Sequence, residues 1–80
     1  KANKYALRLV SMQDWSSWQA VPVYMRDDHI SVIMVNPKDA FVIQDMEAKL
    51  GKYIHVIPYP IEPDQIQRLL AGKRELRHNK

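Results

Sequence analysis

The chain has 80 residues, enough for one small domain with a single hydrophobic core, so a multi-domain enzyme is excluded. Its 46% hydrophobic and 26% charged residues are typical of a globular domain, and the absence of cysteine excludes disulfides, thiol nucleophiles and cysteine-ligated zinc. The net charge of +3 arises in residues 73–80, where Lys73, Arg74, Arg77 and Lys80 are offset by Glu75 alone, and so small an excess does not predict a nucleic-acid footprint.

The first predicted elements are a short N-terminal segment and a short helix. Apolar side chains alternate along residues 5–10, which predicts a short strand or a docked arm. Ser11 and Asp14 then form the start of a capping box, and Trp15 and Trp18 recur at helical spacing on one side. We expect the tryptophan pair to pack inward.

Two strands joined by a tight turn follow. Residues 21–26 predict an edge strand or a strand beginning, because Pro22 has no N–H to give to a neighbouring strand. Asp27 and Asp28 predict the turn, since an Asp side chain bonds to the local backbone. The run 30–35 is apolar at nearly every position, which predicts a central strand covered on both faces.

A helix is expected after this strand. Asn36 followed by Pro37 predicts its start, with Asn36 as the capping residue and Asp39 favoured by the positive end of the helix dipole. The helix should run to about Leu50 and end at Gly51, which can adopt a left-handed conformation.

The last predicted elements are a strand and a second helix. Residues 53–57 read as the strand, and the helix begins near Pro63 with Ile61 and Ile66 placed as a hydrophobic staple. We expect this helix to end at Gly72.

Together these elements predict an α/β fold, a small single domain with a mixed three- to four-stranded sheet. Its β-β-α-β-α core is preceded by an N-terminal arm and a short helix. A strand-helix-strand unit requires a parallel pair joined by a right-handed crossover, and the tight turn makes the first pair antiparallel. We expect the domain to span residues 1–72, and residues 73–80 to form a disordered basic tail or the start of a linker.

No stretch of the chain is apolar for long enough to cross a bilayer, and its start does not resemble a signal peptide. We therefore expect a soluble protein with no direct membrane insertion. Lys1 stands where a complete protein would have its initiator Met, which predicts a piece of a longer chain.

Catalytic, metal and cofactor chemistry is not indicated. His29, His55 and His78 lie in a predicted turn, strand and tail without the spacing of a metal site, so structural roles are expected for them and no metal or cofactor is predicted. With only two glycines, neither phosphate-binding glycine motif is possible, which excludes nucleotide hydrolysis within this chain. The free amides at Asn36, with Lys38 nearby, are an alternative anion site, although plain capping is the favoured interpretation.

A partner interface is the remaining hypothesis. Aromatic and arginine side chains are common in protein interfaces, and four of them are candidates here. These candidate interface residues are Trp18, Tyr24, Arg26 and Arg68.

One stretch of the chain resembles a known family. It comprises the Val21-Pro22-Val23 strand, the strand-to-helix junction from Ile30 to Asp39, the helix closed by Gly51, the strand Ile54–Ile57 and the helix Ile66–Leu70. In this order the pattern resembles the N-terminal domain of type II secretion and type IV pilus assembly ATPases.

The resemblance implies a non-catalytic domain that couples a cytoplasmic ATPase to the cytoplasmic part of a membrane-anchored platform protein, with any ATPase activity in a longer parent chain. Some relatives bind cyclic di-GMP through segments containing Arg-Leu-Gly. This chain has no Arg-Leu-Gly, and its Arg68-Leu69 pair is followed by Leu70. A cyclic-dinucleotide sensor and a small basic nucleic-acid-binding domain are kept as alternatives.

Overall fold

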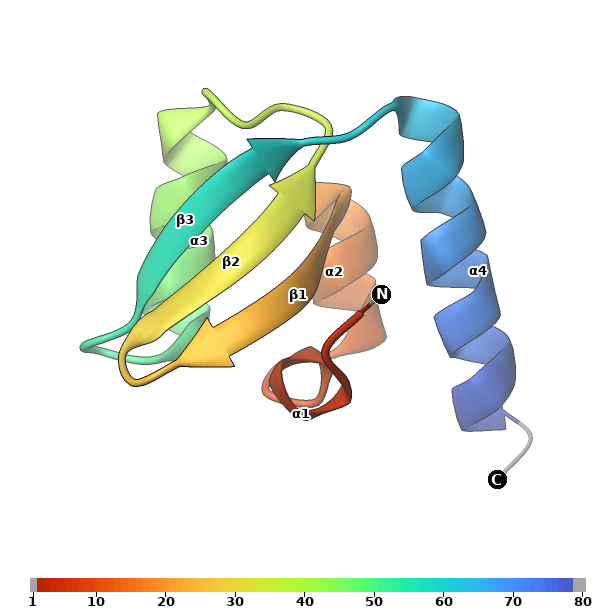
Figure 1. Ribbon diagram of the computed structural model, residues 1–80, viewed down its shortest axis with the longest axis horizontal. Coiled ribbons are helices and arrows are strands. Elements are labelled where there is room, and N and C mark those ends of the chain that lie inside the picture. Colours follow the sequence, from red (N-terminus) through yellow and green to blue (C-terminus); the bar gives the residue numbers. More distant parts are fainter. Residues whose placement is uncertain (1, 79–80) are drawn as a thin grey trace.

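A computed structural model of the chain describes residues 2–78, with side chains described through residue 72. It has an α/β fold with one three-stranded mixed sheet in the order β1-β2-β3 (Figure 1). The elements in chain order are α1 (Lys4–Leu7), α2 (Met12–Trp18), β1 (Ala20–Arg26), β2 (His29–Met34), α3 (Ala40–Leu50), β3 (His55–Pro60) and α4 (Pro63–His78).

The pairing within the sheet is as predicted. β1 and β2 are antiparallel and joined by a turn in which Asp27 has a φ of 54°, and β2 and β3 are parallel with α3 between them in sequence. The apolar β2 is the central strand and β1, with Pro22, lies at an edge. β3 begins later than expected, at His55, because the backbone still turns after α3 and the Ile54 N–H bonds to the Gly51 carbonyl at 3.1 Å.

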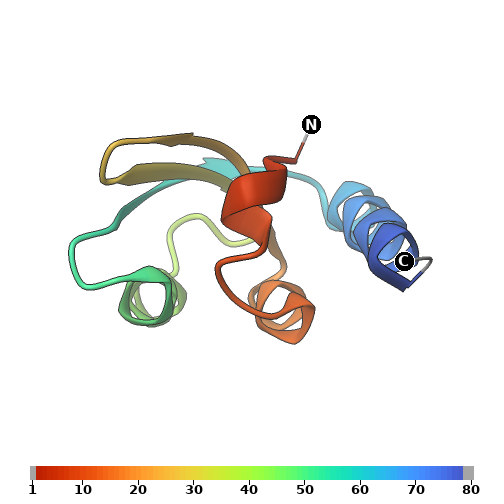
Figure 2. The same ribbon diagram turned by 90° about the horizontal axis from the view of Figure 1, so that it is seen from below.

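In the part of the chain that the structure describes, α2 and α3 cover one face of the sheet and no helix covers the other (Figure 2). Figure 2 shows α2 and α3 beneath the sheet and α4 to its side, where α4 contacts α2 and β1. Ile30, Val32 and Met34 of β2 point into this helix layer and are fully buried, and they share one core with Trp15 and Met46. The prediction that β2 is covered on both faces was therefore wrong, since Ser31 and Ile33 between these positions stay partly exposed.

The N-terminal segment forms a helical turn, so the prediction of a strand at residues 5–10 was wrong. Asn3 caps α1 by accepting a bond from the Ala6 N–H at 2.9 Å, and the turn buries Ala6 and Leu7 together. The Asn3 N–H also bonds to the Pro22 carbonyl at 2.8 Å, so the segment docks on the edge of β1. The Leu7 carbonyl accepts the Trp15 indole N–H at 2.9 Å.

The start of α3 also differs from the prediction. The capping residue is Asp39, whose carboxylate accepts bonds from the backbone N–H groups of Phe41 and Val42. Asn36 opens the preceding turn, in which its carbonyl accepts the Asp39 N–H at 3.1 Å. Pro37 is thus a turn residue, a role for which its fixed φ suits it equally well.

The helix ends differ in a similar way. α3 ends at Leu50 as predicted, but Gly51, with φ 158° and ψ 151°, adopts a positive-φ conformation that favours glycine instead of the left-handed helical one. Gly72 does not end α4, which continues to His78. Residues 73–78 are therefore helical in backbone, and their side chains lie outside the described residues, as do residues 79 and 80 of the predicted tail.

Candidate functional site

The uncovered side of the sheet, the open face, is the candidate functional site. Strand alternation turns every second residue of β2 and β3 away from the helix layer, and the strand register aligns these residues with the outward ones of β1. One row across the three strands holds Arg26, His29 and His55, and the next holds Tyr24, Ser31 and Ile57. The open face comprises Tyr24, Arg26, His29, Ser31, Ile33, His55, Ile57 and Tyr59.

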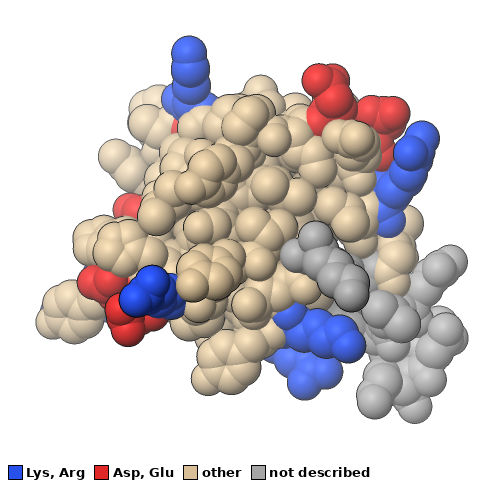
Figure 3. All heavy atoms as spheres, viewed as in Figure 1, with Lys and Arg blue, Asp and Glu red and all other residues tan. Residues whose placement is uncertain are grey.

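Large apolar side chains are exposed on this face. Tyr24 of β1 is 55% exposed, and Tyr59 and Ile57 of β3 are 49% and 36% exposed, with the central strand β2 between them. Figure 3 looks onto this face and shows an uncharged middle with the Lys, Arg, Asp and Glu side chains at its margins. An uncharged, partly aromatic surface with a charged rim is the usual composition of a protein interface.

The free edge of β3 is closed to another strand. The N–H groups of His55 and Ile61 point toward β2 and bond to the carbonyls of Asp28 and Met34, so the backbone nitrogens of Val56, Pro58 and Pro60 face the free edge. Val56 donates instead to the Glu47 side chain at 2.9 Å, and the two prolines have no N–H. Recognition by strand addition at this edge is therefore disfavoured.

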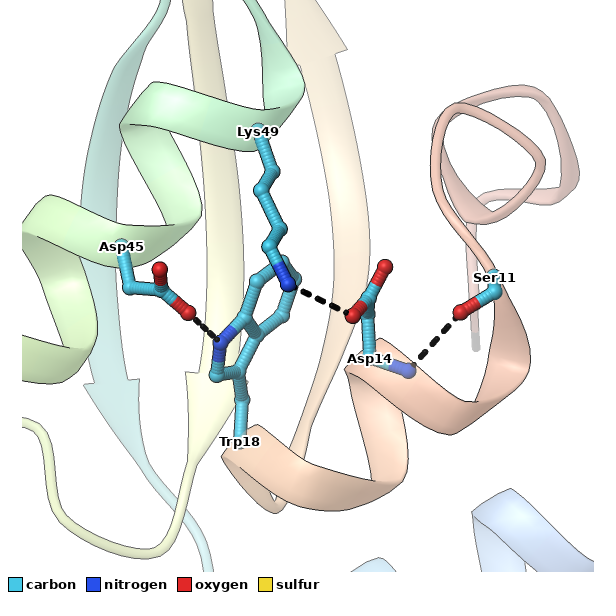
Figure 4. Close-up of polar contacts among 5 residues, drawn as sticks. All are labelled: Ser11, Asp14, Trp18, Asp45 and Lys49. Atoms are coloured by element: carbon cyan, nitrogen blue, oxygen red, sulfur yellow. Dashed lines mark hydrogen bonds and ion pairs between the residues drawn. The ribbon is translucent and has the colours of Figure 1, made fainter.

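Trp18, one of the predicted interface residues, lies on the other side of the sheet. It is only 6% exposed, and its indole N–H donates to Asp45 of α3 at 2.8 Å (Figure 4). Its ring meets that of Trp15 edge to face, with centroids 5.3 Å apart. Trp18 is thus a core residue that joins α2 to α3. Its burial does not fit the prediction that it belongs to a partner interface.

An ion pair also joins α2 to α3 beside Trp18. Lys49 Nζ lies 3.0 Å from the Asp14 carboxylate and 5.9 Å from the centroid of the Trp18 ring (Figure 4). The hydrogen bond from Lys49 holds the pKa of Asp14 below its ordinary value, and the bond to Asp14 raises the pKa of Lys49. We call Asp14, Trp18, Asp45 and Lys49 the α2–α3 clasp, and its contacts are structural.

The other predicted interface residues are exposed but do not form one group. Tyr24 and Arg26 lie on the open face, whereas Arg68 lies on α4 and pairs with Asp64 at 3.8 Å. The predicted interface residues did not include Ile57 and Tyr59, which complete the face from β3. Their alternation with buried Val56 is the signal that could have found them.

The strand-to-helix junction does not favour an anion. It lines an open depression of about 550 Å³ formed by Val35, Asn36, Pro37, Lys38 and Asp39. The first amides of α3, which would bind an anion, already donate to the Asp39 carboxylate. A second anion would have to displace that carboxylate or lie beside its negative charge, which weighs against the anion-site alternative.

A smaller depression of about 450 Å³ lies at α1, lined by Lys4, Tyr5, Arg8 and Leu9. Tyr5 is 73% exposed there. Among the described residues, no group of three or more His, Cys, Asp or Glu side chains converges on a position for a metal ion. None of the helices in the described part of the chain has the length and apolar character needed to span a membrane.

The sequence matches the family of the MshEN domain over residues 1–75, nearly the whole chain. The chain belongs to the MshEN domain family. An MshEN domain is an N-terminal domain of type II secretion and type IV pilus assembly ATPases, so the family expected from the residues between Val21 and Gly72 is confirmed. A search of curated proteins gives no match.

Proposed function

We propose that this MshEN domain is a non-catalytic docking and regulatory domain. It couples a secretion or pilus-assembly ATPase in the cytoplasm to the cytoplasmic part of a membrane-anchored platform protein, which recruits it to the inner membrane. Any ATP hydrolysis belongs to another part of a longer parent chain, and the present chain needs no cofactor for docking.

The observation that carries this proposal is the open face. A domain of this size gains stability by burying apolar area, yet Tyr24, Ile57 and Tyr59 remain exposed on the same face of the sheet. A second protein that covers them would remove this area from water without unfolding the domain. Arg26 is exposed at the rim, where a charged side chain contributes more to the orientation of the partner than to the affinity of binding.

Calorimetric titration with the cytoplasmic region of a platform protein tests the proposal. We expect saturable binding, which a double substitution of Tyr24 and Tyr59 by Ala weakens at least about tenfold, because buried tyrosines at an interface centre commonly each contribute 1 kcal/mol or more. Tyr53, which is 73% exposed in the loop after α3, offers the matched control Tyr53→Ala, which should leave binding unchanged.

Two results would contradict the proposal. One is the absence of heat at concentrations near a millimolar, where even a contact of about −4 kcal/mol registers. The other is equal weakening by Tyr53→Ala and the double variant. Titration with cyclic di-GMP or a short oligonucleotide, followed by backbone amide shifts, tests the two alternatives, and no feature of the described residues favours either.

A further inference from the structure

Two histidines lie together at one end of the open face. His29 begins β2 and His55 begins β3, and the parallel register makes them direct neighbours. The His55 N–H donates to the Asp28 carbonyl at 2.7 Å, which fixes the two backbones, and the ring centroids are 5.4 Å apart with a 42° angle between the planes. Neither ring is needed for the core, since both side chains are exposed.

One carboxylate orients the first ring. Asp28 Oδ1 lies 2.7 Å from His29 Nδ1, so Nδ1 carries the proton of this bond and Nε2 of the neutral ring keeps its lone pair. A carboxylate on the far nitrogen is the usual second partner of a metal-bound histidine, because it fixes the tautomer and raises the basicity of the ligating nitrogen. His29 therefore already has the outer partner that such a ligand requires.

We propose that His29 and His55 form a two-histidine site for a divalent transition metal such as Zn²⁺. Two imidazoles on one tetrahedral zinc, with Zn–N bonds of about 2 Å, have ring centroids roughly 5 Å apart, close to the 5.4 Å of this pair. Imidazole nitrogens suit zinc, nickel and copper, whereas magnesium and calcium require oxygen ligands.

The charges around the pair permit a cation. Arg26 is paired with His29 in the strand register, and its positive charge disfavours a metal ion. The carboxylates of Asp27 and Asp28 at the adjacent turn favour one. Because no third His, Cys, Asp or Glu converges with the pair in the described residues, water fills the remaining coordination positions. The site is thus open and exchangeable, unlike a closed structural zinc site, and the fold does not depend on it.

Zinc chloride titrated into the 80-residue chain tests this site by calorimetry and by the imidazole C–H resonances in NMR spectra. We expect one zinc per chain, with the resonances of His29 and His55 changing together. Either His29→Ala or His55→Ala should weaken binding at least about tenfold, and Asp28→Asn by about tenfold, since loss of an outer partner typically costs that much. Magnesium chloride should give no response at these two rings.

His78, the third histidine of the chain, provides the matched control. His78→Ala should bind zinc as the parent chain does, and the unchanged melting temperatures of all four variants without metal will show that the fold is intact. The site is refuted if the titration does not saturate by about 1 mM zinc, if only one of the two rings responds, if His78→Ala abolishes binding, or if zinc joins two chains instead of binding within one. None of these results bears on docking to a platform protein, because that proposal rests on the exposed Tyr24, Ile57 and Tyr59 of the same face.

Discussion

The two faces of the sheet differ in what holds their side chains. On the helix side, Val32 and Met34 are fully buried, and Trp15 and Trp18 each place the indole N–H on a protein acceptor. On the open face, Tyr59 and its neighbours contact water, and no helix crosses them (Figure 2). The proposed docking surface thus lies apart from the residues that form the core, and we expect residues of the open face to tolerate substitution without loss of the core on the other side.

The largest expected effect comes from a substitution on the helix side of the sheet. Trp15→Ala removes a fully buried ring and the bond to the Leu7 carbonyl, so we expect unfolding to become easier by about 3–5 kcal/mol. A small domain has only about 5 kcal/mol in total, so the variant should be largely unfolded at room temperature. Urea unfolding followed by circular dichroism measures this.

The matched change on the open face is Tyr24→Ala. Because this side chain is 55% exposed and an exposed substitution usually changes stability by no more than about 0.5 kcal/mol, its unfolding curve should nearly overlay that of the parent chain. A loss comparable to that of Trp15→Ala would mean that the open face also stabilises the fold, and the separation of roles would be wrong.

Local patterns predicted much of the helix side. The apolar run of β2, the proline at the edge in β1 and the Ser11 cap of α2 each depend on a few adjacent residues, and all three appear in the structure. The Asn36-Pro37 pair was interpreted as a helix start, but the same pair is equally typical of a turn. Here it forms the turn that precedes α3. Gly72 was misread because the packing of Ile66 and Leu70 carries α4 past a residue of poor helix propensity.

The open face could be predicted only in part. Tyr24 and Arg26 were expected at an interface, but the exposed Ile57 of the same face comes from β3, and only the strand register aligns it with Tyr24 across β2. Trp18 was an interface candidate because aromatic side chains are common at interfaces, and no local pattern indicates its bond to Asp45, which is distant in sequence. Contacts between distant segments thus account for both errors about the site.

The second prediction concerns the cap of α3 in the helix layer. Asp39→Ala removes the acceptor for the Phe41 and Val42 N–H groups, and loss of such a cap typically costs about 1 kcal/mol. Asn36→Ala keeps the backbone carbonyl that closes the turn, so its cost should be smaller. Chemical unfolding of both variants ranks the two effects, and the opposite ranking would restore Asn36 as the cap.

The third prediction concerns Gly72 and the C-terminal end of α4. Gly72 lies inside α4, and a Cβ built on it meets no atom within 4 Å. Gly72→Ala should therefore stabilise the domain by about 0.5–1 kcal/mol, the usual difference between these residues in a helix interior. A lower melting temperature for Gly72→Ala would instead indicate that the helix ends there, as the sequence had suggested.

The smallest effect is the pH dependence of the α2–α3 clasp. Because the hydrogen bond from Lys49 lowers the pKa of Asp14 from 3.8, its stabilisation is present above that value and is lost as the pH falls through the lower pKa of the folded state. Lys49, with a pKa raised above 10.5, gives the mirror result, since its contribution is present below 10.5 and is lost as the pH rises through the higher folded value.

Asp14→Asn tests this directly, with melting temperatures measured from acidic to neutral pH and Asp64→Asn as control. Asp64 pairs with Arg68 on the surface of α4 at the longer distance of 3.8 Å, so its loss should leave the acid limb unchanged. For Asp14→Asn the parent and variant curves should converge below the pKa of Asp14 and separate slightly above it, with the separation reduced by salt because both partners are partly exposed. Parallel curves at every pH would mean that the ion pair does not contribute, and that the contact between α2 and α3 depends on the Trp18 bond and apolar packing alone.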